Sequence, residues 1–283
     1  MKASELLLLL EGSGSINSGP ITVDASSSPS DSTNDTVDPT VTAANLPLSL
    51  SPAGWWDFSD TANMHKTSAG GNPVTADNDL CGLVNDKSGN GRNVTVVDAN
   101  RPTYKTGVQN SKGALLFGSG AASKNLSTAV TFTGADMSMV AAIKSPATIT
   151  GGTTYGFLSE HHTTNGGNSL SISSAGVFAS RTNPTDVTIT GATPTTSTAY
   201  IVGMTAKNSA TQRTLFVNAL TTVTNGTAVT ATDQILRIGT LSVNQTTNFW
   251  TGHILEVLYF NSALSDVNMA AVIAWLNTKW GVF

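Results

Sequence analysis

Two carboxylate residues that are far apart in the sequence, Asp57 and Glu256, are the first candidates for chemistry. Hydrolysis of a glycosidic bond uses two carboxyl groups about 5 to 10 Å apart, and these two can meet if their segments pair as strands. Glu256 lies within an apolar run, however, where a paired or edge-exposed structural acid is the alternative. The sequence has no Gly-x-Ser-x-Gly or His-Glu-x-x-His motif and no phosphate-binding loop. We therefore predict that the protein is not an enzyme.

A second candidate group is the alternating set Asp86, Ser88 and Asn90, which is followed by Gly91. Alternating oxygen ligands before a glycine are typical of the first half of a calcium loop. The position that needs a bidentate acid is occupied by Val97, so the pattern is incomplete. We expect a tight turn capped by the aspartate and no bound metal, with calcium as the alternative.

Glu160, His161 and His162 are adjacent, which raises the question of a metal or acid–base site. Successive residues of a strand point to opposite faces, so the two histidines cannot easily bind the same ion. We expect a loop or strand end at this position and no cofactor.

Four aromatic residues are candidates for a sugar-binding platform: Trp55, Trp56, Tyr155 and Trp250. Aromatic ring faces stack on the C–H surfaces of sugars. Trp55 and Trp56 must face opposite ways if they lie in one strand, which leaves one of them free to point outward. The alternative is that these rings fill the core and rim of the domain.

The composition argues against several classes of function. Charged residues make up 11% of the chain, the net charge is −4, and the 14 basic residues are scattered, which argues against nucleic-acid binding. Cys81 is the single cysteine, so neither an intrachain disulfide nor a cysteine-based zinc site within one chain is possible. No apolar run approaches the roughly 20 residues of a membrane span. We expect a soluble protein that is made in the cytoplasm and does not insert into membranes.

The stretch from Phe249 to Leu264 indicates the centre of the scaffold. Nearly every residue from Ile254 to Phe260 is apolar, which predicts a strand covered on both faces. Ser265 is placed to cap a following helix. Apolar residues then recur at helical spacing, at Met269, Val272, Ile273, Leu276 and Trp280.

Short strands separated by turn residues precede this element. Their spacing is typical of a β-sandwich, and we predict an all-β domain over residues 47–283, two antiparallel sheets packed as a jelly roll with a C-terminal helix. The predicted strands cover residues 113–117, 126–133, 137–144, 155–159, 169–173, 176–180, 186–190, 199–206, 213–217, 235–238 and 254–260.

The N-terminal part differs in composition from the rest. Residues 1–12 predict a two-turn helix with five leucines, Leu6, Leu7, Leu8, Leu9 and Leu10, which cover it all round. A helix this short is marginal alone, so the leucines predict a docking segment for another protein, with packing against its own domain as the alternative. Residues 13–46 are rich in Ser, Thr, Gly and Pro and predict an extended tether.

Several short motifs follow one another over residues 50–283, namely Trp55–Asp60, Asp86–Arg92, Arg101–Tyr104, Ala114–Phe117, Leu215–Asn218, Leu236–Gly239, Gly252–Val257 and Ala263–Asp266. This order resembles that of the laminin-G-like or concanavalin A-like jelly-roll modules found in many phage and bacterial proteins. The resemblance implies a domain that binds glycans or proteins, or that is displayed on a particle.

The main hypothesis from these features is a non-enzymatic structural protein of a bacteriophage virion, either a head-fibre or capsid decoration protein or a tail-fibre protein. Its expected partners are other virion proteins, bound through the N-terminal tail, together with further copies of itself and a glycan. The alternative is a lectin-like carbohydrate-binding module that is not attached to a particle. A glycan hydrolase is the third hypothesis, and it requires two carboxylates that face one groove.

Overall fold

The computed structural model describes residues 46–118, 124–132, 136–160, 167–183, 187–207, 212–218, 223–225, 234–241 and 248–283. The docking segment 1–12 with Leu6–Leu10 and the tether up to residue 45 lie outside the described residues, as do His161 and His162. The predictions made for these residues therefore stay predictions.

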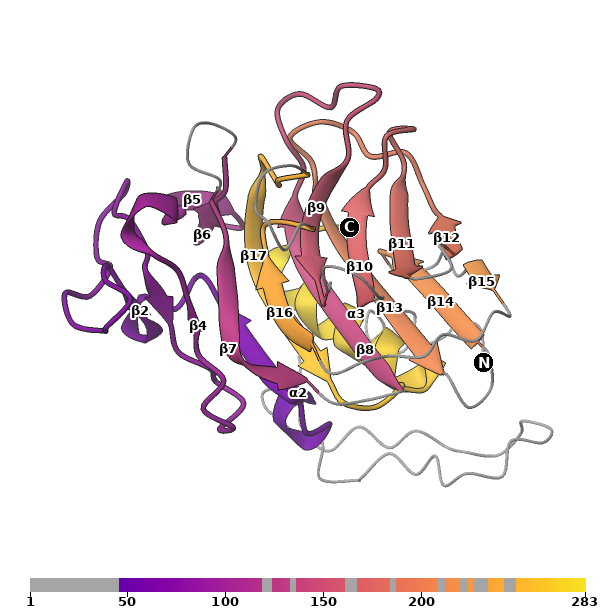
Figure 1. Ribbon diagram of the computed structural model, residues 1–283, viewed down its shortest axis with the longest axis horizontal. Helices are drawn as coiled ribbons and strands as arrows, with labels where there is room; N and C mark the ends of the chain where they lie inside the picture. Colours follow the sequence, from indigo (N-terminus) through magenta and orange to yellow (C-terminus); the bar gives the residue numbers. More distant parts are fainter. Residues whose placement is uncertain are drawn as a thin grey trace, which may run out of the picture.

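Two antiparallel sheets pack face to face, so the predicted all-β sandwich is confirmed (Figure 1). Among the described residues, the first sheet, called sheet A, has eight strands. In spatial order these are β15 (Val223–Asn225), β14 (Gln212–Val217), β13 (Ala199–Lys207), β8 (Met137–Lys144), β17 (His253–Phe260), β6 (Lys112–Leu116) and β5 (Thr103–Gln109), with β1 (Gly54–Asp57) also paired to β17.

The second sheet, called sheet B, has nine strands among the described residues and lies in front of sheet A in Figure 1. Its order is β12 (Val187–Thr190), β11 (Phe178–Asn183), β10 (Gly167–Ile172), β9 (Tyr155–Ser159), β16 (Gln234–Ile238), β7 (Leu126–Phe132), β4 (Val94–Thr95), β3 (Leu83–Val84) and β2 (Met64–His65).

Strand β17 occupies the centre of sheet A, as its apolar sequence predicts. It pairs with β8 along most of its length and also with β1 and β6. Ile254 and Val257 belong to the core between the sheets, whereas Leu258 and Phe260 belong to a second apolar cluster on the outer face of sheet A. A strand between two cores has to be apolar on both faces.

Helix α3 (Asp266–Trp280) covers the outer face of sheet A, behind β8 and β13 in Figure 1. The predicted cap is confirmed, because the Ser265 side chain accepts a hydrogen bond from the Asn268 amide at 3.2 Å. Gly281 ends the helix in the left-handed conformation, with a φ of 57°. The five residues at helical spacing are all buried against the sheet. A short helix, α2 (Leu46–Ser49), precedes β1.

The hairpin between β10 and β11 departs from the prediction. The expected second strand, 176–180, begins later, at Phe178. Gly176 has a φ of 77° and its amide donates to the Ser173 carbonyl at 2.8 Å, which makes it a turn residue. The glycine is needed in the turn because a residue with a side chain rarely adopts this conformation.

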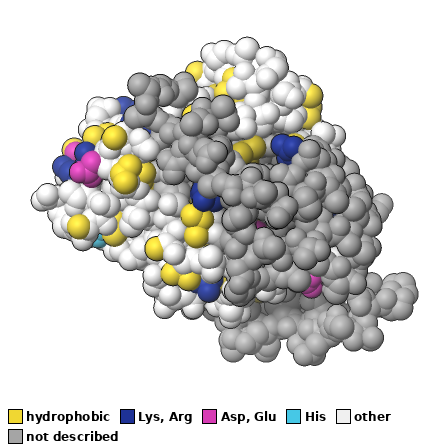
Figure 2. Space-filling view, in the orientation of Figure 1, with side chains coloured by type: hydrophobic (Ala, Val, Ile, Leu, Met, Phe, Trp, Pro, Cys, Tyr) yellow, Lys and Arg dark blue, Asp and Glu magenta, His cyan; other side chains and the backbone are white. Residues whose placement is uncertain are grey.

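On the face shown in Figure 2, the described charged side chains lie in small separate groups. No helix among the described residues combines the length and the apolar character that crossing a membrane requires.

Candidate functional site

The predicted aromatic platform is wrong for Trp56 and Trp250, because both side chains are fully buried. The Trp56 indole donates to the Arg92 carbonyl at 3.0 Å, and the Trp250 indole donates to the His253 carbonyl at 3.2 Å. The Trp250 ring meets Phe157 edge to face, with ring centroids 5.1 Å apart. These rings fill the space between the sheets, and their N–H groups find partners there, so neither ring face is free for a sugar.

Trp55 points to the opposite side of β1 from Trp56, as expected, but α3 covers it. Its ring meets Trp275 of the helix at a centroid distance of 5.8 Å, and its indole nitrogen donates to Glu256 Oε1 at 2.7 Å. Trp55 is only 8% exposed. The prediction that one of the two tryptophans presents a free ring face is therefore wrong, because a helix distant in sequence packs over it.

The two candidate carboxylates do meet. Asp57 and Glu256 are directly paired across β1 and β17, and Lys279 Nζ lies 2.7 Å from Asp57 Oδ2 and 2.8 Å from Glu256 Oε2. The Trp280 indole donates to the same glutamate oxygen at 2.8 Å, and Lys87 lies 3.2 Å from Asp57 Oδ2. Asp57 and Glu256 thus each have a lysine partner, so Glu256 is a paired structural acid, the alternative considered from the sequence.

The pKa values of Glu256 and Asp57 are shifted in opposite directions. Burial raises the pKa of Glu256, and the neighbouring Asp57 charge raises it further, although Lys279 partly offsets both. Burial also acts to raise the pKa of Asp57, but Lys279, Ser59 and Lys87 outweigh it and leave that pKa below its usual value. Glu256 has no exposed surface, so a substrate has no access to it. The pair does not face a groove, as a glycosidase requires.

The segment considered as a calcium loop is a turn organised by Asp86, as expected from the sequence. Oδ1 of Asp86 accepts hydrogen bonds from the amides of Trp55 at 2.9 Å and Ser88 at 2.8 Å, and Oδ2 accepts from the Ser88 hydroxyl at 2.8 Å and the Arg92 amide at 2.9 Å. Asn90 donates to the Pro52 carbonyl at 3.0 Å. Both carboxylate oxygens are thus already used by protein donors. No cluster of three or more His, Cys, Asp or Glu that could hold a metal ion occurs among the described residues.

Glu160 points into the sandwich and is fully enclosed. Oε1 of Glu160 accepts a hydrogen bond from the Tyr259 hydroxyl, and Oε2 accepts one from Asn168 Nδ2 at 3.2 Å. Burial raises the pKa of Glu160 to about 7, although the two donors act in the opposite direction. The group is a buried acid held by uncharged donors.

A pocket of about 470 Å³, called the end pocket below, opens at one end of the sandwich. It lies between loop 145–154, which follows β8, and segment 248–251, which precedes β17. Its lining consists of hydroxyl, amide, aromatic and small apolar side chains, namely Pro146, Ala147, Thr148, Thr153, Tyr155, Asn248, Phe249 and Thr251.

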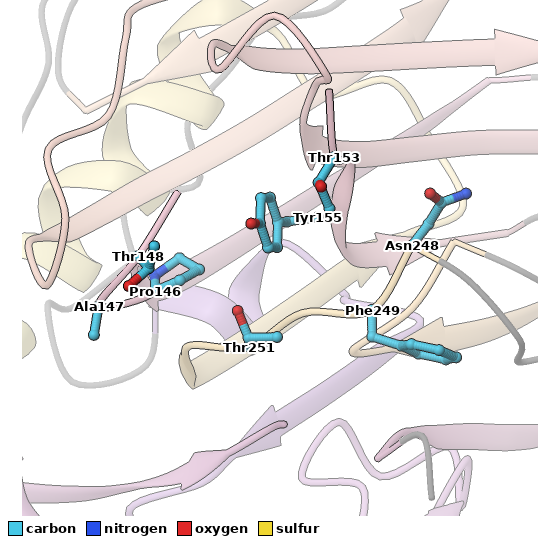
Figure 3. Close-up of a pocket in the computed structure, with 8 residues that line it drawn as sticks. All are labelled: Pro146, Ala147, Thr148, Thr153, Tyr155, Asn248, Phe249 and Thr251. Carbon is cyan, nitrogen blue, oxygen red and sulfur yellow. The ribbon is translucent and has the colours of Figure 1, made fainter. Parts of the chain in front are cut away.

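Figure 3 shows how these side chains are arranged. In this view Thr148 lies to one side of the Tyr155 ring, Thr153 to the other and Thr251 below it, while the side chains of Asn248 and Phe249 point away from the ring. The Tyr155 hydroxyl accepts a hydrogen bond from the Thr150 amide at 3.0 Å, and the ring itself is 7% exposed. Tyr155 lines the pocket with little exposed surface, and its role in ligand binding stays a prediction.

Backbone hydrogen bonds hold both walls of the pocket. The Ser145 amide donates to the Thr198 carbonyl at 2.9 Å, and the Ser197 amide donates to the Pro146 carbonyl at 3.1 Å, which fixes loop 145–154. On the other side, the Gly156 amide donates to the Asn248 carbonyl at 3.1 Å. The walls are thus tied to neighbouring strands, which positions the side chains before a ligand arrives.

Glycine is required where the two walls meet. A Cβ atom at Gly252 would lie 2.4 Å from the Lys144 carbonyl oxygen, and one at Gly156 would lie 2.1 Å from Leu241 Cγ. Asn248 adopts a φ of 61°, a conformation that asparagine tolerates better than most residues. These three positions allow segment 248–252 to run close against β8 and β9.

A second hollow, of about 360 Å³, lies beside α2 and is lined in part by Asn90 and Arg92. Its polar groups already bind one another: Asn90 Nδ2 donates to the Pro52 carbonyl at 3.0 Å, and Arg92 Nη1 donates to the Ala53 carbonyl at 3.3 Å. The end pocket is the better candidate because its threonine side chains have room to bind a ligand.

Apart from Tyr155, the pocket residues were not among the predicted site residues. Threonine is abundant in this chain, so Thr148, Thr153 and Thr251 carry no local signal. The one available hint is the position of Phe249 beside Trp250, immediately before the core strand. A pocket made by two segments about 100 residues apart in sequence depends on the fold.

No protein-family model matches the sequence, and no curated protein does either. Solved structures do match at the level of the fold. The receptor-binding domain of botulinum neurotoxin D matches with a TM-score of 0.54 and 13% identity, over 80% of this chain and 53% of that one. The binding domain of serotype G has a TM-score of 0.54 and 11% identity, over 80% and 51%. A Trypanosoma rangeli sialidase in complex with 2,3-difluorosialic acid has a TM-score of 0.52 and 12% identity, over 80% and 32%.

The chain thus spans about half the length of the toxin domains and a third of the sialidase. Identities this low establish a shared fold and nothing about activity. The sandwich implied by the sequence resemblance is confirmed, while its laminin-G and bacteriophage attribution stays a prediction. The described part of the chain is a two-sheet β-sandwich similar in fold to toxin binding domains and to a sialidase.

Proposed function

We propose that the protein is a lectin-like, carbohydrate-binding module and that it binds glycans in the end pocket. The observation that carries this proposal is the lining of that pocket, where Thr148, Thr153 and Thr251 share one hollow with Tyr155. A hydroxyl group both donates and accepts hydrogen bonds, as the hydroxyls of a sugar do. Aromatic and apolar groups alongside them suit the C–H surface of a sugar ring.

The fold likeness supports the same proposal. A binding domain and a sialidase complex with a sialic acid derivative are among the solved structures that share this sandwich. The proposal for this chain rests on its own pocket, because a fold hosts many functions.

We also propose that the module has no catalytic activity. Asp57 and Glu256, the carboxylates considered for hydrolysis, are paired with lysines and covered by α3. The residues that line the end pocket include no Asp, Glu, His or Cys. General acid–base and nucleophilic catalysis depend mainly on such groups.

The test is to fill the pocket in the full-length protein. Thr153 is exposed and lines the pocket, so Thr153→Trp is expected to lower affinity for glycans found on an array by at least about tenfold, because an indole occupies the ligand volume. Thr131→Trp is the matched control, since Thr131 is exposed on β7 and does not line the pocket. Isothermal titration calorimetry measures the affinity, and thermal unfolding checks that both variants fold.

Two results contradict the proposal. One is an array on which the full-length protein binds no glycan. The other is equal glycan affinity for Thr153→Trp and Thr131→Trp, which would place the binding site elsewhere on the molecule.

A second proposal concerns attachment. The observation that favours a role in a virion is the run Leu6–Leu10, because five consecutive leucines would cover the predicted two-turn helix all round and need another surface to bury them. The expected partners are virion proteins, with further copies of this chain beside them. Deleting residues 1–12 is expected to abolish incorporation into particles while the sandwich stays folded. Incorporation at the level of the intact chain would refute the anchor.

A further inference from the structure

We infer that the end pocket selects uncharged sugar units and discriminates against carboxylated ones such as sialic and uronic acids. This inference rests on the proposed function and names the class of ligand for the same pocket.

The first observation is the charge of the two walls. All eight lining residues are uncharged. The sequence extends this statement beyond the lining, because residues 145–159 and 238–252 contain no Asp, Glu, Lys or Arg. Each of the two segments that form the pocket is therefore uncharged over 15 consecutive residues.

The second observation concerns the ionisable residues that flank these segments, Lys144, Glu160, Arg237 and His253. Lys144 Nζ donates to the Val108 carbonyl at 2.9 Å, and Glu160 is enclosed between the sheets. Arg237 is buried on β16, where it is paired with Ser159 at the far end of β9 from Tyr155. Each of these three groups is thus engaged or enclosed away from the pocket.

The fourth flanking residue, His253, does not bring a positive charge to the pocket either. Burial lowers the pKa of His253 to about 4, and the charges of Lys144 and Lys105 act in the same direction. The imidazole is consequently neutral at pH 7, and it does not supply a cation near the pocket.

The preference for uncharged sugars follows from the strong hydration of a carboxylate. A carboxylate that leaves water needs a charge-assisted partner, most often an arginine fork, to replace its hydration. Threonine hydroxyls and an amide satisfy a sugar hydroxyl but only partly replace the hydration of a full charge. The sialic acid derivative in the sialidase complex is anionic, so the pocket of this chain predicts a ligand class different from the one that the fold likeness brings to mind.

The test uses matched pairs of glycans that differ only in a carboxyl group, such as lactose against 3′-sialyllactose and a glucose-terminated against a glucuronate-terminated oligosaccharide. The full-length protein is expected to bind the neutral member at least about tenfold more tightly in calorimetry at pH 7. Thr148→Arg adds a cation beside Tyr155 and is expected to raise affinity for the carboxylated member and narrow or reverse the ratio. Thr131→Arg adds the same charge on the exposed side of β7, at the end that pairs with Ile235 and outside the pocket, and is expected to leave the ratio unchanged.

The outcomes separate the two levels of proposal. Equal or tighter binding of the acidic member by the wild-type protein overturns the inference while the proposed function stands. An unchanged ratio in a folded Thr148→Arg variant, as judged by thermal unfolding, also overturns it, because the cation would then lie outside the binding site. Absence of binding to any glycan, neutral or acidic, overturns both.

Discussion

The outer face of sheet A and the end pocket differ in their polar side chains, which are charged and buried in the first and uncharged in the second. Beneath α3, two buried carboxylates, Asp57 and Glu256, share Lys279 and bind further donors. At the end pocket the walls carry no charge, and threonine side chains line an open volume. Charge in this molecule is therefore placed where it joins distant segments of the chain, while uncharged hydroxyls are left where a ligand can reach them.

The charged region links the two ends of the domain. Asp57 lies on β1, the first strand of the domain, and Lys279 lies near the end of α3, the last helix. Buried ion pairs contribute little net stability over apolar replacements, but they are costly to break because the remaining charge stays buried. The cluster thus joins the end of α3 to β1 and β17 of sheet A.

The largest expected effect is the removal of the shared cation. Lys279→Met leaves Asp57 and Glu256 buried beside each other with too little compensating charge, and we expect a loss of about 3 kcal/mol in the free energy of unfolding, measured with urea. Lys105→Met, which removes an ion pair with the exposed Asp77, is the control and is expected to cost far less. Equal losses in the two variants would mean that the buried pair does not depend on its lysine.

The next effect concerns Glu160, the buried acid without a cation. Its pKa is raised to about 7, whereas an unfolded glutamate titrates near 4.3. Between these values the folded protein holds a proton that the unfolded chain has lost, so this group makes stability fall as pH rises through that window. From pH 5 to pH 9 this fall amounts to about 3 kcal/mol, because about two pH units separate pH 5 from the folded pKa.

Denaturation of the wild-type protein and Glu160→Gln at pH 5, 7 and 9 measures this contribution. The amide keeps both hydrogen-bond contacts and does not titrate, so the variant is expected to lose less stability over this range than the wild type. Parallel pH profiles for the two proteins would show that Glu160 is ionised in the folded state.

The smallest of the three effects tests the neutral region, whose shape depends on glycine. Gly252→Ala places a Cβ atom 2.4 Å from the Lys144 carbonyl oxygen, and we expect a loss of about 2 kcal/mol together with weaker glycan binding. Gly151→Ala, in loop 145–154 on the opposite wall, has no atom within 4 Å of the added carbon, so it is expected to be neutral. Similar stabilities for the two variants would contradict the close approach of the two walls.

Much of the scaffold is predictable from local pattern. The predicted bounds of β8 and β9 agree with the structure to the residue, and Ser265 caps the final helix as expected. The candidate site is far less predictable. Tyr155 is the one predicted residue that lines the pocket, while Trp250, one residue away from Phe249 in sequence, lies wholly inside the sandwich.

The reason lies in the range of the interactions. Apolar alternation, the serine cap and the glycine stop are local signals that depend on neighbours in the chain. A two-sheet sandwich followed by a helix can therefore be predicted from the sequence alone. Three features depend instead on contacts between distant segments: α3 buries Trp55, two acids share Lys279, and loop 145–154 meets segment 248–251. They follow from the way the sheets and the helix pack, because this packing sets which side chains are covered and which remain open to a ligand.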